Sequence, residues 1–184
     1  CPSFIVENNL NGSLNLLTSS IKHDVKKFVF MSSIIGGKNF DVPNTVYGES
    51  KRTFENILKL LSQRHELTYM IFRPTRVYGP RMALHDPYRE GGETLFVQMK
   101  KSKRDISDAE FKKCIFVKDL VKTITETSFD EKIKNETITM LPTFFNKSDF
   151  GETVEWVNKN YTDKIKQLSF IELQKPVKGG DLHG

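Results

Sequence analysis

The chain has 184 residues, of which 38% are hydrophobic and 28% are charged, and its formal net charge is +5. These proportions are ordinary for a soluble globular protein, and the length suffices for one domain with a hydrophobic core and a small appendage. Its apolar runs are too short to span a membrane, no secretory signal is visible, and two cysteines cannot form a disulfide framework, so we expect a cytoplasmic protein with no membrane partner.

The first 80 residues alternate between helical and strand-like patterns. Apolar residues at helical spacing predict a helix over residues 3–22, and the same spacing returns from Tyr47 to about Arg64. Short apolar runs at residues 27–32 and 67–72 predict two buried parallel strands. This order, with short connections, predicts a parallel sheet with helices on its faces.

After residue 80 the pattern is less regular. Helices are expected near residues 93–101, 117–127 and 148–160, and strands at residues 114–117 and 137–141. The last fifteen residues contain proline and glycine and are predicted to be loop.

A basic stretch lies in this second half. Its members are Lys100, Lys101, Lys103, Arg104, Lys112, Lys113, Lys118 and Lys122. A solvated loop, attraction of an anionic substrate such as a sugar diphosphate, and a nucleic-acid surface all remain open. The lysines lack the regular alternation with aromatic residues that stacks bases, so we expect no nucleic-acid partner.

The sharpest chemical signal is the pair Tyr47 and Lys51. Residues four apart on a helix lie on one face, one turn apart. A free tyrosine has a pKa of about 10 and is a poor proton acceptor at neutral pH. A neighbouring ammonium group favours the phenolate and lowers that pKa, which suits the tyrosine to general acid–base catalysis.

Polar groups also follow both predicted strands. Ser32 and Ser33 end the first strand, and the segment Arg73–Arg81 follows the second. Ligands of open parallel sheets bind beyond the carboxyl ends of the strands, so these residues face the expected site. Turn-forming serines and exposed arginines are the alternative interpretation, whereas bidentate binding of anionic oxygens is the functional one.

Together these motifs resemble the NAD-dependent epimerase/dehydratase family, the extended short-chain dehydrogenase/reductases that act on nucleotide sugars. The matching segments, in family order, are Glu7–Ser13 (similar to N-V-x-G-T), Lys26–Ser33 (the strand with the active-site Ser or Thr), Tyr47–Lys51 (Y-x-x-x-K), Arg73–Pro80 (R-P-x-N-x-Y-G-P), Lys112–Leu120 (R-D-F-I-H-V-D-D-L) and Pro176–Asp181 (P-x-R-x-G-D).

This resemblance implies hydride transfer on a nucleotide-linked sugar with NAD or NADP, NAD being favoured. Tyr47 would take the proton from a sugar hydroxyl, Ser33 would hydrogen-bond the same oxygen, and Lys51 would hold the nicotinamide ribose. The implied cofactor contacts are Tyr47, Lys51, Ser32, Pro74, Thr75 and Arg76. The implied substrate contacts are Asn9, Arg76, Lys112 and Lys178. The four histidines are scattered without ligand spacing, so no metal site is expected.

The resemblance also implies an α/β fold, namely a partial Rossmann-like parallel sheet with flanking helices plus a small C-terminal substrate-binding α/β region. Residues 1–80 would be the C-terminal half of an NAD-binding domain, and residues 81–184 a sugar-nucleotide region with a returning Rossmann strand and helix.

The family's G-x-x-G-x-x-G loop is absent from these residues. We therefore expect an N-terminally incomplete chain that binds NAD poorly alone. Family members pair the helices matching residues 3–22 and 47–64, so a homodimer is expected.

Some positions depart from the family pattern. Arg76 stands where the family usually has Asn, and Lys112 replaces an Arg that meets the substrate diphosphate. The loop from Ser33 to Tyr47 is short and lacks the usual V-Y-G. The sugar, and the choice between epimerase and dehydratase, therefore stay open. Two alternatives remain, an inactive remnant that is an interaction partner of a full-length relative, and a reductase acting on a non-sugar ketone.

Overall fold

The computed structural model describes residues 2–34, 45–82 and 114–141, together with residues 151–153, 155, 156 and 159. The chain forms two compact units, residues 1–78 with 108–145, and residues 79–107 with 146–184. Every helix and strand bounded below lies in the first unit. In the second unit the described residues between 151 and 159 are helical, within the helix predicted at 148–160. The helix predicted at 93–101 and the C-terminal loop lie outside the described residues, and the predicted domain roles stay predictions.

The first helical stretch comprises three consecutive segments, α1 (Pro2–Val6), η1 (Glu7–Asn11) and α2 (Gly12–Lys22). The helix predicted over residues 3–22 is therefore confirmed. Its middle turn is a π-helix, which the sequence pattern does not predict, and there the Gly12 N–H bonds the Glu7 carbonyl five residues back. Single π-turns inside α-helices widen the backbone locally.

Helix α3 (Val46–Ser62) confirms the second predicted helix. It begins at Thr45, whose side-chain oxygen accepts a hydrogen bond from the Gly48 N–H at 3.0 Å. Such a cap satisfies one of the backbone donors that the first turn leaves without a partner. The apolar face of the helix buries Phe54 and Leu58 completely.

The main sheet has three parallel strands in the order β1 (Lys27–Met31), β2 (Thr68–Pro74) and β5 (Glu136–Met140). Phe30 pairs with Ile71, and Ile71 pairs with Thr137 on the other side. Both predicted strands of the first half, and the strand predicted near residues 137–141, are thus confirmed. Within the described part of the chain, β1 has a neighbouring strand on one side only.

A second, two-stranded sheet pairs β3 (Arg76–Tyr78) in parallel with β4 (Cys114–Phe116). The strand predicted at 114–117 is confirmed, but the sequence predicted no strand at residues 76–78. Strand β3 forms by pairing with β4. Just before it, the Thr75 N–H bonds the Met140 carbonyl at 3.2 Å, which extends the pairing with β5 one residue beyond β2. The turn begins at Gly79, whose φ of 151° is in the region that favours glycine.

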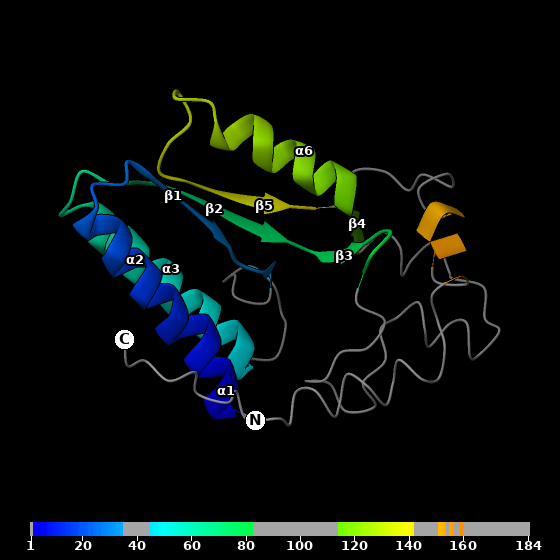
Figure 1. Ribbon diagram of the computed structural model, residues 1–184, viewed down its shortest axis with the longest axis horizontal. Helices are drawn as coiled ribbons and strands as arrows, with labels where there is room; N and C mark the ends of the chain where they lie inside the picture. Colours follow the sequence, from blue (N-terminus) through cyan, green and yellow to red (C-terminus); the bar gives the residue numbers. More distant parts are fainter. Residues whose placement is uncertain are drawn as a thin grey trace, which may run out of the picture. The chain divides into compact units, whose positions relative to one another are not determined.

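Helices cover both faces of the main sheet (Figure 1). One face packs against α2 and α3 through a core of Leu17, Phe28, Phe30, Phe54, Leu58, Leu67 and Ile71. The other packs against α6 (Val117–Ser128) through Met70, Phe72, Ile115, Leu120 and Met140. This helix confirms the one predicted at residues 117–127. This three-layer arrangement is the α/β architecture that the sequence predicts.

The side chain of Lys27 joins the start of β1 to the end of α6. Its Nζ atom donates to the carbonyl oxygens of Ser128, Asp130 and Ile133 at 3.0, 3.0 and 3.2 Å. The last carbonyls of a helix have no partner within it, and a cation there also meets the negative end of the helix dipole. Lys27 therefore has a structural role.

Candidate active site

Apart from Asn9, the predicted site residues that the structure describes lie at the carboxyl ends of β1 and β2 and at the start of α3. Ser32 and Ser33 follow β1, and both are buried. Tyr47 and Lys51 occupy the first two turns of α3, and residues 74–76 join β2 to β3. Lys112 and Lys178 lie outside the described residues, so their predicted roles stay predictions.

Lys51 lies between Tyr47 and the end of β1. Its Nζ atom donates to the Met31 carbonyl oxygen at 3.0 Å and lies 5.9 Å from the centroid of the Tyr47 ring. The same nitrogen is 5.0 Å from the centroid of the Phe30 ring. Burial lowers the pKa of the Lys51 amine from its ordinary value, since desolvation disfavours the ammonium form. The amine thus lies beside Tyr47, as the four-residue spacing predicts.

Tyr47 as a whole residue remains 37% exposed, although it belongs to a helix packed on the sheet. A phenol that is partly open to solvent is accessible to a ligand. Ser33, by contrast, is buried two residues beyond Met31, the last residue of β1. The catalytic roles of Tyr47, Lys51 and Ser33 themselves stay predictions.

A buried polar network joins the ends of β1 and β2 to α3. Glu55, only 1% exposed, accepts hydrogen bonds from the Ser32 hydroxyl and from Arg73. Arg73 binds it with both Nε, at 2.9 Å, and Nη2, in the bidentate geometry that suits a guanidinium and a carboxylate. The hydrogen bonds to Glu55 raise the pKa of Arg73. The Ser32 hydroxyl is thus bound to Glu55, and its predicted cofactor contact stays a prediction.

Asn9 lies in the π-helical segment and contacts α3. Its Nδ2 atom donates to the Ser50 hydroxyl at 3.3 Å, and that hydroxyl donates to the Tyr47 carbonyl at 2.8 Å. Asn9 is therefore linked to the turn of α3 that carries Tyr47. Its predicted substrate contact stays a prediction.

Residues 74–76 differ in their surroundings. Arg76 is exposed, whereas Thr75 is buried. Within the described part of the structure, the Thr75 Oγ1 atom has no hydrogen-bond partner. A buried hydroxyl that lacks a partner is uncommon in folded proteins and calls for an explanation, such as water or a ligand.

Comparison with known proteins identifies the family. The model of the NAD dependent epimerase/dehydratase family matches residues 2–124. The chain belongs to this family. A UDP-glucose 4-epimerase of Vibrio cholerae is 36% identical over 86 residues, which are 40% of this chain and 26% of that protein.

Solved structures of epimerases also resemble this member of the epimerase/dehydratase family. The Thermotoga maritima UDP-glucose 4-epimerase, solved with UDP-glucose, is 25% identical, with a TM-score of 0.59 over 98% of this chain and 60% of that one. The Thermus thermophilus UDP-glucose 4-epimerase, solved as a complex with NAD, is 19% identical, with a TM-score of 0.59 over 83% of this chain and 70% of that one. The expected Rossmann-like α/β fold is thereby confirmed.

The chain of this epimerase/dehydratase family member covers only part of its relatives. The two matched sequence relatives are covered over 30% and 26% of their own length. The activity, substrates and partners of those proteins are therefore carried to this chain only as proposals below.

Two contributors to the family member's site were absent from the predicted set. Glu55 connects Ser32 with Arg73, and Ser50 connects Asn9 with the Tyr47 backbone. Glu55 had a signal in the sequence, since it stands between the apolar residues of the buried helix face, one turn beyond Lys51. A carboxylate on an apolar helix face needs a buried partner.

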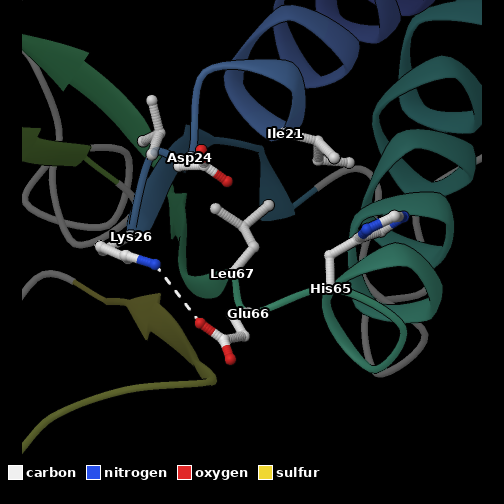
Figure 2. A pocket seen from close by; sticks show the side chains of 7 residues that line it. Ile21, Asp24, Lys26, His65, Glu66 and Leu67 are labelled. Carbon is white, nitrogen blue, oxygen red and sulfur yellow. Dashed lines mark hydrogen bonds and ion pairs between the residues drawn. The ribbon is translucent and has the colours of Figure 1, made fainter.

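A hollow of about 150 Å³ lies at the other end of the strands (Figure 2). Its lining residues are Ile21, Asp24, Val25, Lys26, His65, Glu66 and Leu67, which precede β1 and β2. It contains the Lys26–Glu66 ion pair, at 3.4 Å, and both side chains of this pair are largely exposed. Ligands of parallel α/β sheets bind at the carboxyl ends of the strands, so we assign this hollow no part in the site.

Metal sites and membrane spans are both missing from the described residues. There, no three His, Cys, Asp or Glu side chains gather closely enough to hold a metal ion. Likewise, no described helix has the length and apolar character needed to cross a membrane.

Proposed function

We propose that this chain is the catalytic part of an NAD-dependent nucleotide-sugar epimerase or dehydratase. The observation that carries the proposal is the position of the Lys51 amine, which is anchored on the Met31 carbonyl beside the Tyr47 ring. This position supports a role of Tyr47 and Lys51 as a general acid–base pair, because ligands of such sheets bind at the carboxyl ends of the strands.

In the proposed reaction Tyr47 accepts the proton of a sugar hydroxyl through its phenolate oxygen. Lys51 favours the phenolate because its ammonium group lies beside the ring. Ser33, buried at the end of β1, hydrogen-bonds the oxygen that loses the proton. A bound nicotinamide would accept the hydride from the carbon that bears this hydroxyl. Return of hydride to the opposite face of the oxidised sugar, with the proton from Tyr47, would give an epimer, whereas loss of water from the oxidised sugar would lead to a dehydration product.

The residues at the β2–β3 junction fit a bound cofactor. The buried Thr75 hydroxyl lacks a partner in the described residues, which supports a ligand that accepts or donates a hydrogen bond there. We assign Pro74, Thr75 and Arg76 to the cofactor, with Tyr47 and Lys51 at the ribose and Ser32 nearby. NAD is favoured over NADP on the family's description, "NAD dependent".

A nucleotide sugar is the proposed substrate class. Matched relatives are named UDP-glucose 4-epimerases, and one structure was solved with UDP-glucose. We assign Arg76, Lys112 and Lys178 to the anionic diphosphate and Asn9 to the substrate side of the site. The net charge of +5 supports attraction of such an anion. The cytoplasmic location stays a prediction.

The 184 residues contain no G-x-x-G-x-x-G turn, the element that binds pyrophosphate in the family fold. We therefore propose that this polypeptide alone binds NAD weakly and turns over slowly or not at all. The absence of this motif from the sequence also supports a second candidate function, an inactive interaction partner of a full-length relative. Calorimetric titration with NAD tests the proposed weak binding, and a micromolar affinity contradicts it.

Adding such an element tests the catalytic proposal. A family segment with a strand, the G-x-x-G-x-x-G turn and a helix is joined ahead of Pro2, and the fusion is incubated with NAD and UDP-glucose. NMR of the nucleotide sugar then detects an epimer or a dehydration product. A fusion that folds and binds NAD, yet converts neither UDP-glucose nor other nucleotide sugars, supports the inactive partner instead. Conversion of a simple ketone alone supports the reductase.

We also propose a homodimer through helices 3–22 and 47–64. The outer faces of these helices expose large apolar side chains, with Leu16 at 61% and Leu60 at 49% exposure. Two antiparallel helix pairs from two copies bury such faces in a four-helix bundle.

A further inference from the structure

Two successive residues at the end of β1 are each tied to α3. The Met31 carbonyl accepts from Lys51, and the next residue, Ser32, donates to Glu55. Lys51 and Glu55 are four residues apart and lie on one face of α3, so both hydrogen bonds are made from that face. The residue after these is Ser33, a candidate catalytic residue. The side chains of Lys51 and Glu55 therefore connect helix α3 to the end of strand β1.

We propose that Glu55 is a positioning residue that holds the end of β1 against α3 and so keeps Lys51 beside Tyr47; this rests on the proposed function. Its carboxylate receives Ser32 from β1 and Arg73 from β2 at once. A carboxylate has about four acceptor positions, which lets one side chain join both strands to the helix. Lys51 keeps its place only while the Met31 carbonyl stays within reach.

Apolar packing alone does not set this alignment. The Phe30 and Phe54 rings, with centroids 4.5 Å apart, already hold α3 on the sheet. Hydrophobic contact is non-directional, and exchanging a buried ion pair for apolar residues is often neutral or stabilising. Hydrogen bonds, in contrast, have narrow distance and angle limits and therefore fix the helix along the strand direction. The network thus contributes precision at the site that packing does not supply.

A direct electrostatic effect of Glu55 on Tyr47 has the opposite sign. The two residues are eight apart, or about 12 Å along the helix axis. Removing a distant negative charge favours the phenolate and lowers the pKa of the phenol. Loss of positioning moves the Lys51 ammonium away from the ring and raises that pKa. The sign of the shift therefore separates the two effects.

The Tyr47 pKa is measured on the chain itself by NMR titration of ¹³Cζ-labelled tyrosine, with Tyr47→Phe identifying the signal. The variants are Ser32→Ala, which keeps the Glu55–Arg73 pair and changes no charge, and Glu55→Gln. The matched control is Glu49→Gln, which removes the more exposed Glu49–Arg52 pair, 2.8 Å apart, from the same helix. Lys51→Met provides the reference for complete loss of the ammonium group. Thermal unfolding of each variant reports stability separately.

The proposal predicts that Ser32→Ala and Glu55→Gln raise the Tyr47 pKa toward the Lys51→Met value, by about half a unit or more. Glu49→Gln also removes a negative charge but leaves the ties to β1 in place, so it does not raise the Tyr47 pKa. If Lys51→Met raises the pKa but Ser32→Ala and Glu55→Gln lower it or leave it in place, Glu55 has no positioning role and the proposed function stands. If Lys51→Met itself has no effect, the proposed function fails, and the positioning role fails with it. Should Glu55→Gln not fold, Ser32→Ala decides alone.

Discussion

The Nζ atom of Lys51 donates to the carbonyl oxygen of Met31, the last residue of β1, at 3.0 Å. The Ser32 N–H bonds the Phe72 carbonyl, and the Thr68 N–H bonds the Lys26 carbonyl. The backbone N–H and C=O groups of the even-numbered residues along β1 therefore point toward β2. In a parallel ladder the alternate residues direct their backbone groups to the other side. The Met31 carbonyl therefore lies on the edge away from β2, where Lys51 is its partner. One contact satisfies an edge acceptor and places the amine beside Tyr47.

The burial of the Lys51 amine makes the stability of the protein depend on pH. The pKa of Lys51 is lowered in the folded protein from its ordinary value of 10.5, so the unfolded chain binds more protons in the alkaline range below that value. Stability therefore rises with pH there. We expect wild type to gain stability relative to Lys51→Met as pH rises toward 10.5. Urea unfolding near neutral pH and just below 10.5 measures this. Lys59→Met, on the same helix, is the control, and parallel behaviour of wild type and Lys51→Met contradicts the prediction.

Glu55→Ala is expected to destabilise the fold by about 3–5 kcal/mol, because it leaves Arg73 and Ser32 without their partner. The matching change at the half-exposed pair, Glu49→Ala, is expected to cost less than about 1 kcal/mol. Urea denaturation compares them. The double variant Glu55→Leu with Arg73→Met removes both charges and is expected to recover much of the loss. Equal effects of the two single changes argue against a buried network.

Phe54→Ala tests the core beneath α3. Phe54 is fully buried, and its ring centroid lies 6.0 Å from that of Phe28 and 4.5 Å from that of Phe30. We expect a loss of about 3–5 kcal/mol, because the cavity left by the ring is lined by rigid strand residues. Val121→Ala, at an exposed position of α6 outside the proposed dimer interface, is expected to change stability by about 0.5 kcal/mol or less. Similar values for both variants show that the aromatic cluster is not the core.

Tyr47→Phe tests the proposed proton transfer. In the fusion that includes the G-x-x-G-x-x-G segment, we expect turnover to fall by about 10²–10⁴-fold, since the phenol oxygen that accepts the proton is removed. NAD affinity is expected to stay nearly the same, because the ring and its contacts remain. Turnover by NMR and NAD affinity by calorimetry are measured on both proteins. A Phe variant that turns over normally rules out Tyr47 as the general acid–base.

The homodimer is tested by charge on its proposed interface. Leu16→Glu and Leu60→Glu place carboxylates on the exposed apolar faces of α2 and α3. We expect both to shift the mass in light scattering from dimer to monomer at micromolar concentration, because burying an unpaired charge is unfavourable. Val121→Glu, at an exposed position of α6, is expected to leave the mass unchanged. A monomeric wild type contradicts the proposal.

Periodic features were predictable because they depend on short-range geometry. Apolar spacing located α3, α6 and both strands of the first half, and the spacing of Tyr47 and Lys51 placed them on one helix face. The strand β3 was missed because it is only three residues long and lies between the turn-forming residues Pro74 and Gly79. Its pairing with β4 joins segments that are far apart in the sequence, such as Arg76 with Cys114.

The sequence by itself determined the parallel α/β class, the family, and the adjacency of Tyr47 and Lys51, since local periodicity and motif order encode them. Tertiary structure decided the partners of the polar side chains. Glu55 binds Ser32 and Arg73, and Lys51 binds a strand carbonyl, only because packing of α3 on the sheet brings distant segments together. Once that packing excludes water, each buried polar group must bond the groups that the fold places beside it.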